Sequence, residues 1–143
     1  MADFNSNLAA PDNATLWQAI KHIRFAMLVT EEDNGALTSR PMTAVQRDYD
    51  GVLWFFASIS QHPATAVAQR PAVNVSFADA PEQLYVSLSG QATVTQDRAK
   101  IAELINPAVE EWFPGGVDNP DIALIRIEVQ HVGYWDTREH KGY

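Results

Sequence analysis

Residues 72–95 read AVNVSFADAPEQLYVSLSGQATVT, and this stretch decides the fold class. Its two halves, residues 72–78 and 84–95, have the apolar and β-branched composition of strands, and Asp79-Ala80-Pro81-Glu82 turns the chain between them. Gly90 interrupts the second half, which indicates a bulge in that strand. Strands joined by turns rather than by crossover helices favour an antiparallel barrel over a doubly wound sheet.

Four more strands are expected around this pair. They lie at residues 25–30, 36–47, 52–57 and 122–129. Because residues 52–57 are dense in apolar and aromatic side chains, we expect a central strand there. Pro41 indicates an edge, a bulge or an opening in the ladder of its strand. The sequence thus predicts a six-stranded antiparallel sheet.

Two or three helices are expected beside the strands. The first starts among the N-cap candidates of residues 11–15 and ends near Arg24. Its apolar positions at helical spacing are Leu16, Trp17, Ile20 and Ile23. A second helix is expected from Pro63 to Arg70, with Ser60 or a neighbour as its cap. Residues 97–104 have helical composition, and Asn106-Pro107 restarts a helix toward Trp112. The predicted class is mainly β (α+β).

The composition is that of one globular domain. With 143 residues, 46% of them apolar and 20% charged, the chain is long enough for one core and too short for two ordinary domains. We expect a single domain over residues 1–143, with residues 1–11 flexible and residues 137–143 as a tail. The formal net charge of -8 argues against nucleic acid and anionic membranes as partners.

The cysteine content and the first residues predict a cytoplasmic protein. The absence of cysteine excludes disulfides and thiolate metal sites. The start MADFNSNLAAPDNA has neither a basic region nor an apolar run of signal length. No apolar stretch approaches the roughly 20 residues of a transmembrane helix, so no membrane segment is expected.

The common catalytic and nucleotide-binding motifs are absent. The sequence contains no GxGxxG, GxxxxGK[ST], HExxH or GxSxG. The four histidines, His22, His62, His131 and His140, show no ligand spacing, so the sequence supports no metal site. The pairs Glu31-Glu32 and Glu110-Glu111 could act as acid or base, but their place at a turn and at a helix end favours solvated surface. No catalytic residue is assigned.

Three segments place polar or aromatic residues where a strand meets a loop. Residues 38–42 put a lone cation beside the strand irregularity, where an ordinary surface arginine is the simpler interpretation. Residues 56–60 run into the helix at Pro63, where free N–H groups could hold a phosphate, although plain capping is commoner. Tyr134-Trp135-Asp136, after the last strand, could close the core or stack on a planar ligand.

An ordered set of motifs gives these segments a common interpretation. In chain order they are SRPM (39–42), LWFFAS (53–58), RPAVNVSF (70–77), YVSLSGQATV (85–94), the helix at Asp97-Arg98, EEWFPGG (110–116) and GYWD (133–136). This set resembles the FMN-binding split-barrel superfamily of pyridoxamine 5'-phosphate oxidase-like proteins, and within it the general stress protein 26 group. The resemblance extends from about Ile20 to Asp136, nearly the whole chain.

The resemblance implies a six-stranded split barrel that forms a homodimer with one flavin in each of two interface clefts. The flavin would be FMN, with FAD as the alternative. Arg40 would help bind the phosphate, and residues 56–58 would contact the ring and the ribityl chain. Trp112 and Trp135 fall where related proteins bring aromatic residues from the partner subunit. The full set of implied cofactor-binding residues is Ser39, Arg40, Pro41, Met42, Phe56, Ala57, Ser58, Ser60, Gln61, His62, Trp112 and Trp135.

One departure concerns the phosphate. The family's Ser-x-Lys falls on Gln61-His62-Pro63, so its lysine is missing here. Losing this charge weakens the capture of an anion by an acidic protein. Six groups could compensate: Arg40, Ser58, Ser60, Gln61, His62 and the N-terminus of the following helix.

Three functions remain open from the sequence. The first is a flavin-dependent oxidoreductase acting on a small molecule, in which the cofactor carries the chemistry. The second is a flavin-binding or flavin-sequestering stress protein without turnover, and the third is a split-barrel dimer that has lost its cofactor. Oxidation of pyridoxamine 5'-phosphate itself is not expected, because Arg138 and Lys141 are the only basic candidates near the C-terminus.

Overall fold

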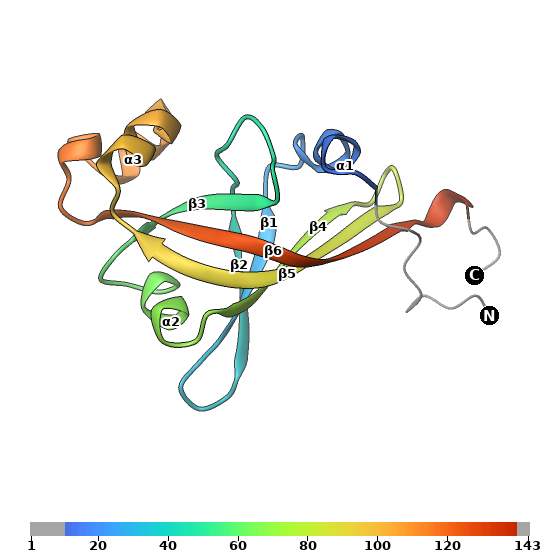
Figure 1. Ribbon diagram of the computed structural model, residues 1–143, viewed down its shortest axis with the longest axis horizontal. Helices are drawn as coiled ribbons and strands as arrows, with labels where there is room; N and C mark the ends of the chain where they lie inside the picture. The colour runs from blue at the N-terminus through green and yellow to red at the C-terminus, as the bar shows by residue number, and fades with distance from the viewer. Residues whose placement is uncertain (1–10, 140–143) are drawn as a thin grey trace.

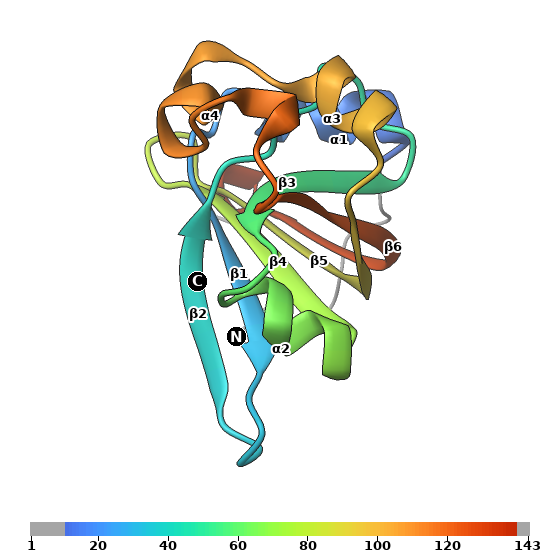
Figure 2. The same cartoon turned by 90° about the vertical axis from the view of Figure 1, so that its left-hand side faces the viewer.

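Six antiparallel strands form one sheet in the order β2-β1-β4-β5-β6-β3. In this computed structural model, which describes residues 11–139, the sheet curls into the half-barrel of a split barrel (Figures 1 and 2). The strands are β1 (Ala26–Glu31), β2 (Leu37–Met42), β3 (Val52–Ser58), β4 (Ala72–Asp79), β5 (Leu84–Thr95) and β6 (Ile122–Asp136). The predicted strand number and antiparallel pairing are therefore confirmed.

Within residues 11–139, four α-helices flank the sheet, where two or three were expected. They are α1 (Asn13–Ile20), α2 (Ala64–Gln69), α3 (Arg98–Leu104) and α4 (Pro107–Trp112), with 3-10 turns η1 (Gly116–Asp118) and η2 (Thr137–Glu139). In Figure 2, α1, α3 and α4 lie along the top of the molecule, whereas α2 lies lower and packs against β5 and β1. None of the helices within residues 11–139 is long and apolar enough to cross a membrane.

The ends of the chain are only partly described. The flexible start expected for residues 1–11 falls outside the described residues except for its last position. Of the expected tail, residues 137–139 form η2, and residues 140–143 lie outside the described part of the chain.

The β4–β5 hairpin pairs without a register shift, and the irregularity expected at Gly90 lies in the pairing of β5 with β6. Val73 lies opposite Gly90, and Phe77 lies opposite Val86. On its other side, β5 pairs with β6, and the register shifts between Ser89 and Gly90. A Cβ atom on Gly90 would lie 2.0 Å from the backbone oxygen of Glu128, so the close approach of β6 requires glycine here.

The expectation of a central strand at residues 52–57 is wrong, because β3 lies at the end of the sheet and pairs only with β6. Its apolar composition reflects burial on both faces rather than a central position. Phe55 belongs to the main core, while Trp54 and Phe56 pack against a second apolar cluster beneath α3 and α4. Residues just before β3 form hydrogen bonds with its outer edge. The Val45 N–H donates to the Trp54 oxygen over 3.2 Å, and the Gln46 side chain bonds the Val52 oxygen and the Trp54 N–H.

Three boundaries differ from the sequence prediction. Helix α1 begins after the N-cap Asp12, as expected, but ends at Ile20 rather than near Arg24. Strand β2 ends at Met42, where the chain leaves the ladder just after Pro41. Strand β6 continues to Asp136, because its second half pairs with residues 84–89 of β5. The segment Tyr134-Trp135-Asp136 therefore lies within the last strand and not after it.

Two apolar clusters hold these elements together. The larger one joins α1, through Leu16 and Ile20, to the inner face of the sheet, where Leu28, Phe55 and Leu88 are fully buried. The smaller cluster consists of Ile101, Leu104, Val109, Ile122 and Leu124. It fixes α3 and α4 at the start of β6.

Candidate functional site

Two predicted phosphate-binding residues, Arg40 of β2 and His62 before α2, converge on the carboxylate of Glu32. The His62 Nε2 atom lies 3.2 Å from Glu32 Oε2, and the Arg40 Nη2 atom lies 3.7 Å from Glu32 Oε1. The hydroxyl of Thr65, at the start of α2, lies 3.2 Å from His62 Nδ1. Residues from a hairpin and from a helix entrance thus form one cluster of polar side chains, which we call the Glu32 cluster: Glu32, Thr38, Arg40 and His62.

Hydrogen bonds within the β1–β2 hairpin hold Arg40 in this cluster. Its Nη2 atom donates to the Thr38 hydroxyl over 2.7 Å, and its Nη1 atom donates to the Leu28 oxygen over 3.4 Å. The Thr38 hydroxyl in turn donates to Glu32 over 2.8 Å. The Arg40 side chain is only 21% exposed, so its guanidinium is positioned before any ligand arrives.

The interpretation of Glu31-Glu32 as solvated surface is wrong for Glu32, whose side chain is 23% exposed and contacts both Arg40 and His62. Part of this role could have been read from the hairpin. Leu28 lies opposite Arg40 and Thr30 opposite Thr38, so alternation along β1 directs Glu32 to the same side as these residues. The contact with His62 depends on the tertiary fold and has no local signal.

A second ion pair ties the same hairpin to the other end of α2. Arg70 Nη1 lies 2.7 Å from Asp33 Oδ1. The adjacent acids Glu32 and Asp33 therefore contact residues at both ends of α2, His62 before it and Arg70 after it.

The predicted residues on β2 divide between the two faces of the sheet. Arg40 and Met42 share the side of Leu28 and Ala26, whereas Ser39 and Pro41 lie beside Val29 and Met27 on the other side. The register pairs between β1 and β2 are Ala26–Met42, Met27–Pro41, Leu28–Arg40 and Val29–Ser39. A ligand on one face can therefore meet the side chains of only half of this segment.

Ser58 and Ser60 are both bound to Asp121, a residue the sequence did not single out. The Ser58 hydroxyl donates to Asp121 Oδ2, and the Ser60 hydroxyl donates to Oδ1 over 3.0 Å. The hydrogen bonds from Ser58, then Ser60, hold the pKa of Asp121 below its ordinary value. The expectation that Ser60 or a neighbour caps the following helix is wrong, because α2 begins at Ala64 without a side-chain cap.

The remaining members of the predicted set lie in different surroundings. Ala57 is buried in the main core, and Phe56 packs against the cluster beneath α3 and α4. Gln61 is exposed, and its N–H donates to the Ser58 oxygen over 3.3 Å. Trp112, at the end of α4, is 82% exposed, and Trp135 of β6 lies opposite Tyr85 of β5.

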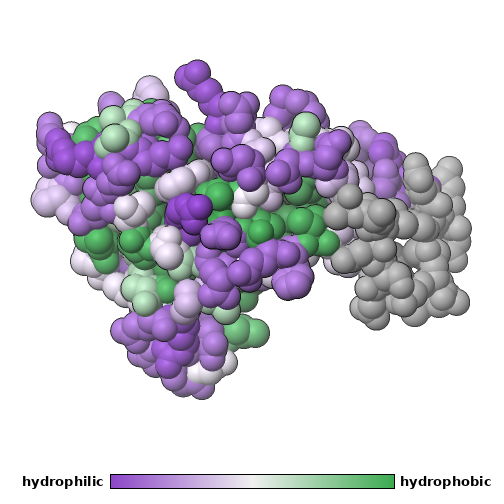
Figure 3. Space-filling model, viewed as in Figure 1, coloured by the Kyte–Doolittle hydropathy of each residue, from purple (hydrophilic) through white to green (hydrophobic). Residues whose placement is uncertain are grey.

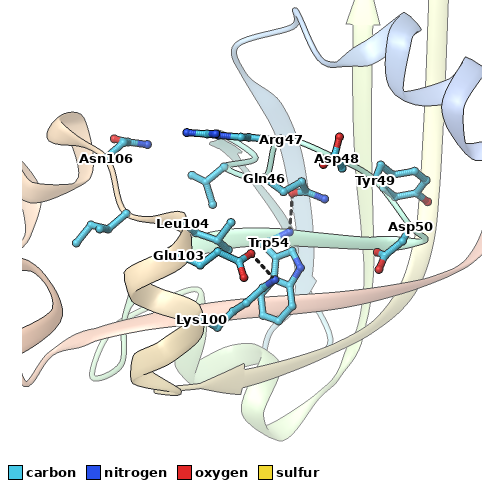
Figure 4. Close-up of a pocket in the computed structure, with 12 residues that line it drawn as sticks. Gln46, Arg47, Asp48, Tyr49, Asp50, Trp54, Lys100, Glu103, Leu104 and Asn106 are labelled. Carbon is cyan, nitrogen blue, oxygen red and sulfur yellow. Dashed lines mark hydrogen bonds and ion pairs between the residues drawn. The ribbon is translucent and has the colours of Figure 1, made fainter.

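A cleft of about 610 Å³ lies away from all these residues, between the loop after β2, strand β3 and helix α3 (Figure 4). Trp54 lies at its centre, with the Lys100 ammonium 4.8 Å from the centroid of its ring. Lys100 also pairs with Glu103 over 2.8 Å. None of the twelve predicted site residues lines this cleft.

The Glu32 cluster offers donors suited to a phosphate group. Arginine, histidine and a hydroxyl are common phosphate ligands, and the Arg40 guanidinium can make two parallel hydrogen bonds. Within residues 11–139, no three His, Asp or Glu side chains are grouped so that they could hold a metal ion. The cluster thus combines groups that can donate to an anion with a carboxylate that already contacts them.

The curled six-stranded sheet with flanking helices defines a split-barrel protein. The chain belongs to the pyridoxamine 5'-phosphate oxidase-like family, whose sequence model matches residues 12–142. A general stress FMN/FAD binding protein from Xanthomonas citri is 32% identical, with a TM-score of 0.74 over 86% of this chain and 87% of that one. General Stress Protein 26 from Bacillus anthracis has the same fold, with a TM-score of 0.76 at 20% identity over 87% of this chain and 93% of that one. Protein bli-3 of Neurospora crassa is 25% identical over 121 residues, which span 78% of this chain and 58% of that protein.

Proposed function

We propose that this protein binds a flavin mononucleotide and holds its phosphate at Arg40 and His62. The observation that carries the proposal is the convergence of these two side chains, from separate elements, on one point in the fold. The family's usual lysine is absent from position 63, and the His62 imidazole would take its place beside Arg40. The Xanthomonas citri relative, described as an FMN/FAD binding protein, supports the same ligand class.

The residues of the chain would bind and orient the flavin. Arg40, already held by Thr38 and the Leu28 oxygen, would give the phosphate two N–H donors, and His62 would give a third. The strand ends at residues 39–42 and 56–58 would contact the ring and the ribityl chain through their backbone. A bound flavin supplies hydride and electron transfer, so the protein needs no acid or base of its own for that step.

We further propose that the flavin lies between two copies of the chain. Several large apolar side chains are exposed in a single copy: Phe25, Met27, Leu37, Tyr85 and Trp112. Figure 3 shows apolar groups, interrupted by hydrophilic side chains, in the region where Figure 1 places β5 and β6. A second subunit would cover part of this surface and bring Trp112 toward the neighbouring flavin.

The test of flavin binding is direct. Protein purified without added cofactor should be yellow and show flavin absorbance, and mass spectrometry of the released ligand should identify FMN rather than FAD. Sedimentation should give a dimer. Colourless protein that also fails to bind added FMN would show that this split barrel has lost its cofactor.

Redox turnover is tested separately. Stopped-flow reduction by NADH or NADPH, followed by reoxidation with a panel of small acceptors, should show catalytic cycling if the protein is an oxidoreductase. Flavin that is bound but never reduced or reoxidised at a useful rate would indicate storage of the cofactor instead.

A further inference from the structure

We propose that Glu32 sets how strongly this site discriminates between a phosphorylated and an unphosphorylated flavin. The inference rests on the proposed function and goes beyond it, because it assigns the degree of phosphate selectivity to one acidic residue. It starts from the finding that the carboxylate of Glu32 contacts the same two side chains, Arg40 and His62, that the phosphate would use.

The carboxylate of Glu32 contacts the other three side chains of the cluster, Thr38, Arg40 and His62. One of its oxygens accepts from Thr38 over 2.8 Å and lies 3.7 Å from Arg40 Nη2, while the other lies 3.2 Å from His62 Nε2. A phosphate that approaches Arg40 and His62 must either displace these contacts or share the donors. In both cases the carboxylate lowers the net gain from binding the phosphate.

The low net charge of the cluster also limits the free energy gained by binding a phosphate. Arg40 carries one permanent positive charge, His62 adds one only when protonated, and Glu32 removes one. The cluster therefore carries between zero and one positive charge, whereas a phosphate monoester carries about -1.5 to -2 at pH 7. With the side chains of Glu32 and Arg40 only 23% and 21% exposed, solvent screens this imbalance incompletely.

The unfavourable effect of the Glu32 charge does not apply to the riboflavin part of the ligand, which is uncharged. Riboflavin has the same ring and ribityl chain as FMN but lacks the phosphate, so the charge of Glu32 has little effect on its binding. The ratio of riboflavin to FMN dissociation constants therefore isolates the contribution of the phosphate end of the site.

The experiment measures both dissociation constants by flavin fluorescence titration for the full chain and two variants. Glu32→Gln keeps the size of the side chain and an oxygen that can accept from Thr38, but removes the charge. Glu31→Gln removes an equal charge one residue away, and within residues 11–139 the Glu31 side chain makes no hydrogen bond or ion pair. It is therefore the matched control for net charge.

We expect Glu32→Gln to tighten FMN binding by about tenfold at low salt, the scale of one charge interaction at a partly buried site. Riboflavin affinity should stay within about twofold, and the gain for FMN should shrink as salt is added. Glu31→Gln should change the ratio of the two constants by less than about twofold, because its charge lies outside the cluster.

Several results would overturn the inference while leaving flavin binding intact. They are an unchanged ratio in Glu32→Gln, weaker FMN binding in that variant, an equal gain for riboflavin, or an equal gain in Glu31→Gln. Weaker binding would show that Glu32 orients Arg40 for the phosphate rather than competing with it. If no variant binds either flavin, both the proposed function and this inference are wrong.

Discussion

The carboxylate of Asp121 accepts a hydrogen bond of 3.0 Å from the hydroxyl of Ser60, which lies 61 positions earlier in the chain. Ser58 donates to the other oxygen of the same carboxylate. Asp121 precedes β6, and Ser58 ends β3, so these contacts join the exit of one strand to the entrance of its partner. The loop that leads to His62 is thereby anchored on the side away from Glu32.

We expect this anchor to make stability depend on pH in the acid range. The folded pKa of Asp121 lies below its ordinary value of 3.8, because the serine hydroxyls bond the charged form. Its contribution is therefore fully present above the unfolded pKa and is lost as the pH falls through the folded pKa. The free energy of unfolding by urea, measured from pH 6 to pH 3, should fall more steeply for the wild type than for Asp121→Asn. Glu111→Gln, which removes an exposed charge, should keep the wild-type slope.

Replacing Arg40 should weaken FMN binding. Arg40→Ala removes the permanent charge and both N–H donors from the proposed phosphate site, and a loss of about 1 to 3 kcal/mol in binding free energy is expected. Titration calorimetry measures this change, with Arg98→Ala as the control, because Arg98 is exposed and pairs with Asp118. Unchanged affinity in Arg40→Ala would move the phosphate site elsewhere in the fold.

Trp112 should matter for association and little for the fold of one subunit. Its ring is 82% exposed, so Trp112→Ala should change the unfolding free energy of a dissociated subunit by less than about 0.5 kcal/mol. If the ring lies in the subunit interface, sedimentation should show a weaker dimer for Trp112→Ala and a smaller effect for Trp112→Phe, which keeps an aromatic ring. A dimer as tight as the wild type in both variants would place Trp112 outside the interface.

Gly90 should be the glycine least tolerant of a side chain in the strands. In Gly90→Ala the new Cβ atom would lie 2.0 Å from the Glu128 oxygen, so β5 and β6 would have to separate at the bulge. A loss of roughly 1 to 3 kcal/mol or more in unfolding free energy is expected. Gly35→Ala provides the comparison, because that residue has a φ of +83° but no atom within 4 Å of the added Cβ. Its cost should be limited to backbone strain of about 1 kcal/mol, and equal losses in the two variants would contradict the steric explanation.

Features set by neighbouring residues were predictable from the sequence. Composition and turn residues identify β4, β5 and their connection, and Gly90 marks the bulge because nothing else in that strand breaks its pattern. Asp12 likewise caps α1 through a bond to the N–H of Thr15, three residues away. In each case the decisive contact is local or follows from strand alternation.

Features set by distant partners were not predictable. The apolar residues of β3 show that both faces are buried, but they do not show that the strand lies at the end of the sheet. The charged pair of Glu32 and His62 and the bonds from Ser58 and Ser60 to Asp121 join segments that meet only after folding. The family resemblance predicted the role of Arg40, whereas the contact of the Glu32 carboxylate with His62 is known only from the structure.

The side chain of Gln46 has a consequence for how copies of this protein meet. Its amide nitrogen donates to the Val52 oxygen, and its amide oxygen accepts from the Trp54 N–H. The Val45 N–H donates to the Trp54 oxygen. These backbone groups on the outer edge of β3 therefore already have partners. Unpaired edge groups are the template on which strands from other molecules add and aggregates grow. Because residues of the same chain bond to these edge groups, another molecule cannot add a strand here. Any association at this edge must therefore use side-chain contacts.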